Sequence, residues 1–267
     1  MRKAKPMPSR SLLRSAVLLL LSLSAARVTA ADEPFVLVSD VDDTVKVTDV
    51  LHRKVAAWNA VHSELVFAGM PELYRDLLGT NSPSERLEFI SGSPRILLTH
   101  KVDECLRDAH FPAFRAALRN RVGSVADFKT RILRKLYGAS ENRFLLIGDD
   151  TESDPEVYAK FANAKKPDQV LAIYIHQITG RALPPHSIPY LTAYDIALKE
   201  YQAHRLNAVQ VGAVGVAVLA SQEAAFLPGF QKCPQEYAQI PDLPKPLEVL
   251  QTQIRDRMKD LCSKRAH

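Results

Sequence analysis

The chain has 267 residues, of which 46% are hydrophobic and 24% charged, as in ordinary globular proteins. The formal net charge is +5, but six basic residues and no acidic one lie within the first thirty positions. Without those six, 29 Lys and Arg face 30 Asp and Glu. The body of the protein is therefore not basic, and its overall charge does not indicate nucleic acid or an anionic membrane as a partner.

The first thirty residues have the three parts of a secretory signal peptide. A basic segment precedes the apolar run Ala16–Leu23, and small residues at Val28 and Ala30 predict cleavage after Ala30. A transmembrane anchor is the alternative, but this run is short for a bilayer and is followed by Ser, Ala and Arg. We therefore expect export to a periplasm or to the medium, with residues 1–30 removed.

An apolar run at Phe35–Ser39 predicts a strand that is buried on both faces, as in a parallel sheet. Three carboxylates follow at Asp40, Asp42 and Asp43. Ligands bind beyond the carboxyl ends of such strands, and crowded acids favour a bound cation or a retained proton. This stretch indicates a metal with carboxylates that act as nucleophile and acid/base. A capping turn rich in Asp is the alternative.

A second apolar strand at Leu87–Ser91 ends in a hydroxyl, and Gly92 to Pro94 opens a helix from about Arg95 to Arg107. A hydroxyl beside a helix N-terminus can hold a phosphate oxygen. Simple capping explains Ser93 equally well. Between the two strands, helical spacing over residues 55–65 and 70–78 predicts either a small cap insert or the first crossover helices.

The spacing predicts a helix over Ala126–Tyr137, with Lys129 near its start. A cation there opposes the helix dipole, although an exposed lysine is the default interpretation. Phe144–Asp150 is another apolar strand that ends in carboxylates, and Val170–Ile175 is a further buried strand. Alternating strands and helices predict an α/β fold with a doubly wound, Rossmann-like parallel sheet flanked by helices.

The C-terminal part reads as helical, and we expect residues 32–204 to form the α/β domain and residues 205–267 a helical extension. Leu206–Leu219 is apolar but too short to span a bilayer, which favours a helix packed on the core. Cys233 and Cys262 lie in this extension and Cys105 in mid-chain. Export allows a Cys233–Cys262 disulfide, and three buried thiols are the alternative.

These motifs, in their order along the chain, resemble those of the haloacid dehalogenase-like phosphohydrolases. The closer resemblance is to the phosphatidate phosphatase catalytic domain of a fungal cortical actin-patch protein and its bacterial relatives. It covers about Phe35 to Ile175. The segments that carry it are Asp40–Thr48, Gly69–Tyr74, Ser91–Pro94, Gly148–Tyr158 and Leu171–Ile175, together with Lys129.

The resemblance implies a role for each residue that matches these motifs. Asp40 would attack phosphorus and form an aspartyl-phosphate, and Asp42 would serve as general acid and base. Mg²⁺ would be held by Asp40, the Asp42 backbone carbonyl and Asp149, with Asp154 orienting Lys129 or a metal-bound water. The groups that would bind the phosphoryl oxygens are Ser91, Gly92, Lys129 and Thr44.

Two departures from the family pattern lie near loops that we expect to face the substrate. Phe111-Pro112 is not followed by a Gly-containing segment, and His176 stands where an Arg is usual. Three hypotheses follow. The first is a phosphatase acting on phosphatidate or a related lipid phosphate at a membrane surface, the second is an exported phosphatase for soluble phosphomonoesters, and the third is a non-catalytic module that binds a phosphate ligand. The sequence does not indicate an oligomeric state.

Overall fold

The computed structural model describes residues 34–265 apart from 121–122, 139 and 167. The predicted signal peptide, residues 1–30, lies outside these residues. Six parallel strands form one sheet in the order β3-β2-β1-β4-β5-β6. Their bounds are Phe35–Ser39 (β1), Leu87–Pro94 (β2), Arg115–Arg119 (β3), Arg143–Asp149 (β4), Val170–His176 (β5) and Ser187–Tyr190 (β6). This confirms the predicted parallel α/β fold.

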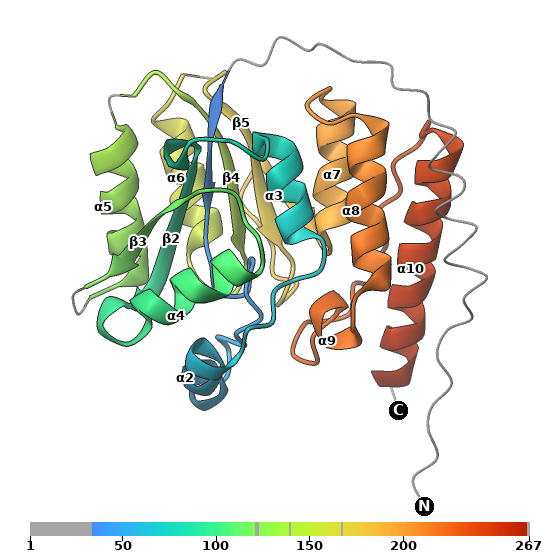
Figure 1. Ribbon diagram of the computed structural model, residues 1–267, viewed down its shortest axis with the longest axis horizontal. Coiled ribbons are helices and arrows are strands. Elements are labelled where there is room, and N and C mark those ends of the chain that lie inside the picture. Colours follow the sequence, from blue (N-terminus) through green and yellow to red (C-terminus); the bar gives the residue numbers. More distant parts are fainter. Residues whose placement is uncertain (1–33, 121–122, 139, 167, 266–267) are drawn as a thin grey trace, which may run out of the picture.

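Helices cover both faces of the sheet (Figure 1). Their bounds are Arg53–His62 (α2), Met70–Leu78 (α3), Arg95–Asp108 (α4), Val125–Tyr137 (α5), Asp154–Asn163 (α6), Ala193–Gln202 (α7), Ala208–Ala220 (α8), Glu223–Phe226 (α9) and Lys245–Arg265 (α10). One hydrophobic cluster joins α5 and α6 to one face of the sheet, and a larger one joins α3, α4, α7, α8 and α10 to the other.

Strand β1 shows why the sheet is buried on both sides. Phe35 and Leu37 belong to the larger cluster, whereas Val36 and Val38 belong to the smaller one. Successive side chains of a strand point to opposite faces, so an unbroken apolar run serves both clusters. The buried, apolar interior of the sheet thus holds the end of β1 in a fixed position.

Two edge strands were not predicted from the sequence. Strand β3 at Arg115–Arg119 and strand β6 at Ser187–Tyr190 contain charged or polar residues, and their side chains are mostly half-buried or exposed. Pro189 is compatible with an edge strand because it need not donate to a second neighbour. The edge strands therefore lack the apolar signal of the four inner strands.

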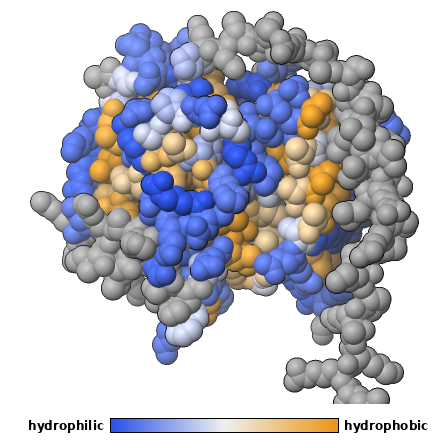
Figure 2. All heavy atoms as spheres, viewed as in Figure 1, coloured by the Kyte–Doolittle hydropathy of each residue, from blue (hydrophilic) through white to orange (hydrophobic). Residues whose placement is uncertain are grey.

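The C-terminal extension packs on the core of the α/β domain. Val211, Val214 and Val218 of α8 are buried in the larger cluster, together with Ile254 and Met258 of α10. Among the described residues no helix has the length and apolar character needed to cross a membrane. In the view of Figure 2 the surface is mainly hydrophilic, with hydrophobic residues also at the surface over the C-terminal helices.

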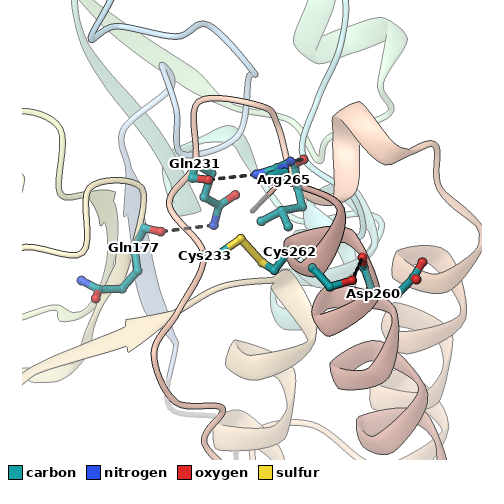
Figure 3. The surroundings of a disulfide bond; sticks show 8 residues. Gln177, Gln231, Cys233, Asp260, Cys262 and Arg265 are labelled. Atoms are coloured by element: carbon teal, nitrogen blue, oxygen red, sulfur yellow. Dashed lines mark hydrogen bonds between the residues drawn. A yellow bond between two sulfur atoms is a disulfide. The ribbon is translucent and has the colours of Figure 1, made fainter. Parts of the chain in front are cut away.

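A disulfide cross-links two positions within the C-terminal extension. The Cys233 and Cys262 sulfur atoms are joined, whereas Cys105 is a buried free thiol. Arg265 donates to the backbone carbonyl of Gln231 at 3.0 Å, beside the bridge (Figure 3). The bridge and this bond hold the segment before Cys233 against the end of α10.

We expect Cys233→Ser to lower the free energy of unfolding by about 3–4 kcal/mol, because the bridge links residues 29 apart in sequence and so restricts the unfolded chain. Urea unfolding of the oxidised proteins measures this difference. Cys105→Ala keeps the bridge and serves as the control. Equal unfolding midpoints for the parent and Cys233→Ser would contradict the prediction.

Candidate active site

The site lies where the strand order of the sheet reverses. Strand β1 has β2 on one side and β4 on the other, and the chain leaves β1 and β4 toward opposite sides. The carboxyl ends of such strands form the usual binding crevice of a doubly wound sheet. Asp40 follows β1 directly, with its N–H bonded to the Ile147 carbonyl at 2.9 Å, and Asp149 ends β4.

Three buried carboxylates meet at this point. Each of Asp40, Asp149 and Asp154 offers an oxygen that lies within 4.8 Å of the others. The ammonium of Lys129, on α5, donates to Asp40 Oδ1 at 2.6 Å and also pairs with Asp154, in the first turn of α6. The Lys129 side chain is only 1% exposed. The lysine that by default would lie at the surface is therefore part of the site.

The electrostatics of this cluster favour an additional positive charge. Burial raises the pKa of Asp40 well above its ordinary range; Lys129 opposes this, and Asp154 and Asp149 add to it. Burial likewise raises the pKa of Asp154 to about 7. For Lys129, burial alone would lower the pKa, but Asp154 and Asp40 raise it above its ordinary range. A bound cation would offset the excess of carboxylates and keep Asp40 ionised.

The donor atoms of the cluster suit a hard metal ion. Asp154 Oδ2 is buried and has no hydrogen-bond partner among the residues that the structure describes, so it remains an unused acceptor. Asp149 is oriented by Thr44 Oγ1, which donates to its Oδ2 at 3.2 Å, and by the N–H of Thr151 at 2.7 Å. Buried carboxylates with free oxygens bind divalent cations well. These residues therefore fit a metal ion.

The carboxylate of Asp42 has a different environment. Ser91 Oγ and Ser93 Oγ donate to its Oδ2 at 3.0 and 2.6 Å, and Thr48 Oγ1 donates to its Oδ1 at 2.9 Å. The three-carboxylate group comprises Asp40, Asp149 and Asp154, without the Asp42 side chain. The two carboxylates thus have different neighbours: Asp40 lies among charged groups, whereas Asp42 is held by hydroxyl groups.

Asp43 stabilises the loop that carries both acids. Its backbone is left-handed, with φ at 55°. Its carboxylate accepts the N–H groups of Thr48, Asp49 and Val50 at 2.9, 2.8 and 2.7 Å. Burial and the nearby charge of Asp149 raise the pKa of Asp43 to about 7. The side chain thus closes the turn after Asp42.

The other residues singled out in the sequence fall around this centre. Ser91 is fully buried, and its hydroxyl accepts the N–H of Ser93 at 3.0 Å. The Gly92 carbonyl accepts from Arg119 Nε at 2.8 Å. Asp150 turns away from the carboxylate cluster, and its carboxylate accepts the N–H groups of residues 178–180.

The structure places His176 in a buried position at the end of β5. Its ring is 1% exposed and stacks on Tyr190, with the centroids 4.8 Å apart. Nδ1 lies 2.9 Å from the Asp43 carbonyl, and Nε2 lies 3.1 Å from both the Leu191 carbonyl and the side-chain amide nitrogen of Gln231. Burial lowers the pKa of His176. His176 therefore supports the Asp43 turn.

The C-terminal extension directly contacts His176 and the residues that follow it. Gln231 also donates to the Gln177 carbonyl at 3.2 Å, and the N–H of Lys232 donates to the Ile178 carbonyl at 2.8 Å (Figure 3). The disulfide follows at Cys233. The segment that the bridge holds is therefore packed against the end of β5.

Sequence reasoning missed the hydroxyls that hold the site carboxylates. Thr48, Ser93 and Thr151 each donate to one of them. Thr48 matches the motif of the resembling family, but its role became visible only when the loop placed it against Asp42. Ser93 was equally compatible with a helix cap.

Residues 35–177 match the family described as phosphatidate phosphatase APP1, catalytic domain. This match covers more than half of the chain. The chain belongs to this family. The family is one of phosphoric monoester hydrolases, and phosphatidate is the ester that its description names.

One similar curated protein is an uncharacterized protein of Schizosaccharomyces pombe, 27% identical over 154 residues. The alignment covers 53% of this chain and 25% of that protein, so the chain spans only about a quarter of the relative. No solved structure matches the chain. The matched family segment contains all four acids named for the site, together with Ser91 and Lys129.

We expect Gly148→Ala to impair the site. A Cβ at Gly148 would lie 2.6 Å from Asp154 Oδ2 and 2.8 Å from Tyr158 Cε2, so Asp154 or β4 must shift. Overpacking of this kind costs about 1–3 kcal/mol of stability, and misplacement by about 1 Å can cost a hundredfold in rate. Thermal unfolding and phosphate release measure the two effects.

Gly229→Ala is the matched control, because a Cβ there meets no heavy atom within 4 Å. If Gly148→Ala matched this control in both thermal unfolding and phosphate release, Asp154 would tolerate displacement and the prediction would be contradicted.

Proposed function

We propose that this protein is an Mg²⁺-dependent phosphomonoester hydrolase that works through an aspartyl-phosphate on Asp40 and acts on phosphatidate or a closely related lipid phosphate. The observation that carries the proposal is the separation of the two acids of the catalytic loop. Asp40 lies among carboxylates and the Lys129 ammonium, whereas Asp42 accepts three hydroxyl hydrogen bonds. Such a division suits one nucleophile and one proton carrier.

The proposed reaction has two steps. A carboxylate oxygen of Asp40 forms a bond to phosphorus while the bond from phosphorus to the leaving oxygen breaks, and Asp42 gives that oxygen a proton. Asp42 then takes a proton from water as the water oxygen attacks phosphorus and releases Asp40. Lys129 Nζ, already 2.6 Å from Asp40 Oδ1, is placed to neutralise a phosphoryl oxygen.

Ser91 is the group that connects substrate binding with Asp42. Its hydroxyl donates to Asp42 Oδ2 at 3.0 Å in the structure. A phosphoryl oxygen arriving beside Asp40 offers that hydroxyl a charged acceptor in place of Asp42. Ser93 and Thr48 continue to hold Asp42 when Ser91 turns.

The metal site that we propose consists of Asp40, Asp149 and Asp154, with the backbone carbonyl of Asp42. Mg²⁺ suits these hard oxygen donors. When bound, it would supply the positive charge that neutralises the phosphoryl group and the surrounding carboxylates. Within this arrangement Lys129 keeps Asp154 oriented, and Thr44 and Thr151 keep Asp149 oriented.

We also propose that the protein works outside the cytoplasm, after removal of residues 1–30. Disulfides persist in oxidising compartments, and the bridge between Cys233 and Cys262 supports this location. A lipid phosphate at a membrane surface is a substrate that an exported phosphatase can reach.

We expect Asp40→Asn to lower phosphate release by about 10³-fold or more, because the amide cannot act as the nucleophile. EDTA should abolish activity in the parent, and Mg²⁺ should restore it. Asp127→Asn, at an exposed position of α5, is the control for loss of a carboxylate outside the site. Activity that survives Asp40→Asn would exclude the aspartyl-phosphate route.

We expect a higher kcat/KM for phosphatidate in mixed micelles than for p-nitrophenyl phosphate, because the proposed substrate is the lipid ester. Both esters are assayed with the same enzyme and the same Mg²⁺ concentration. A preference for the soluble ester would assign the site to soluble phosphomonoesters and leave the chemistry unchanged.

A further inference from the structure

Helix α2 carries an exposed apolar face beside the active site. Figure 1 shows α2 projecting from the body of the protein at the end of the sheet where β1 finishes. Among the described residues five large apolar side chains are exposed, and three of them lie here: Leu51, Val55 and Trp58, at 45%, 44% and 63%. The other two, Leu136 and Val209, lie on α5 and α8.

Val55 and Trp58 are three residues apart on α2, which places them on the same side of the helix. Leu51 lies in the turn that leads into α2. Asn59 donates to the Thr48 carbonyl at 3.2 Å, and Ala56 is half-buried. One side of α2 therefore faces the protein, and the side with Trp58 faces outward.

The outward face also has a positive charge. Lys54 is exposed and lies four residues before Trp58 on α2, so it borders the same face. The sequence of α2 contains Arg53 and Lys54 and no acidic residue. Although the body of the protein has no net basic charge, this helix presents a local combination of apolar and basic groups.

We propose that the surface formed by Lys54, Val55 and Trp58 of α2, together with Leu51 in the turn before it, docks on the surface of an anionic lipid bilayer and brings the active site to a phosphate headgroup. The inference rests on the proposed lipid phosphate substrate. Tryptophan with apolar neighbours and a lysine is suited to the boundary between headgroups and acyl chains. Three neighbouring apolar side chains suffice for shallow insertion, whereas a stable protein interface needs about 800 Å² on each partner.

The segments before and after α2 pair with each other next to the loop that contains Asp40 and Asp42. The N–H of Val47 bonds to the Leu65 carbonyl, and the N–H of Phe67 bonds to the Val45 carbonyl, both at 2.9 Å. Thr48, in the segment before α2, donates to Asp42. A bilayer that contacts α2 is therefore close to the loop with Asp40 and Asp42, at the end of the sheet that a headgroup must enter.

Trp58 provides a direct probe, because it is the single tryptophan of the chain. We expect its fluorescence to shift to shorter wavelength with vesicles of phosphatidylcholine and phosphatidylglycerol, and to change little with phosphatidylcholine alone. Phosphatidylglycerol supplies negative charge as a phosphodiester, so the measurement does not depend on turnover. An unchanged spectrum with anionic vesicles would overturn the proposal.

Substitution separates docking from catalysis. We expect Val55→Ser to reduce sedimentation with anionic vesicles about tenfold, since the variant buries less apolar surface in the bilayer. Hydrolysis of phosphatidate in vesicles should fall in parallel. Leu136→Ser, at the exposed apolar position of α5, is the matched control and should sediment like the parent. Equal sedimentation of both variants would overturn the proposal.

Hydrolysis of p-nitrophenyl phosphate and of a short-chain, water-soluble phosphatidate should proceed at the parent rate in Val55→Ser, because neither ester needs a bilayer. A parent protein that hydrolyses neither ester but still sediments would reject the proposed function and leave the docking face in place. Light scattering tests whether a second copy of the chain covers this face instead. A parent protein that is dimeric, with a monomeric Val55→Ser variant, would assign the face to the dimer interface and overturn the proposal of bilayer docking.

Discussion

The active site depends on one buried cation. Lys129, on α5, pairs with Asp40 after β1 and with Asp154 at the start of α6. A buried ammonium is tolerated only when it is paired, and buried carboxylates likewise need a partner. The ion pairs therefore tie three elements, distant in sequence, to one point. Since Lys129 cannot fully balance Asp40, Asp149 and Asp154, the same arrangement that fixes the geometry also leaves a place for a metal ion.

The sheet supplies the precision that this arrangement requires. Asp40 and Asp149 follow neighbouring strands whose residues are buried on both faces, so neither backbone can move without disturbing two hydrophobic clusters. Gly148 lets α6 approach β4 until Asp154 reaches the cluster. Burial then raises the pKa of Asp40 and Asp154, whereas a positive charge such as that of Lys129 lowers it and so favours the ionised acids. Packing and electrostatics thus act on the same few atoms.

Much of the fold and of the candidate site could be predicted from the sequence, because apolar runs end at residues of the site. The apolar runs of β1, β2 and β4 pointed to Asp40, Ser91 and Asp149 at their ends, and the resemblance supplied the roles of these residues together with Lys129 and Asp154. The edge strands β3 and β6 have no such run and were missed. The burial of His176 could not be predicted either, since it depends on partners, Gln231 and Tyr190, that are distant in sequence.

The C-terminal extension shows why the family match alone does not define the working unit. The match ends at residue 177, yet Gln231 reaches His176, and His176 supports the turn at Asp43, next to Asp40 and Asp42. The larger hydrophobic cluster likewise joins Leu37 of β1 to Val214 of α8 and Ile254 of α10. A chain cut at the end of the match would expose this apolar surface and leave His176 Nε2 without its neighbour Gln231. The extension is therefore part of the structure that holds Asp40 and Asp42 in place.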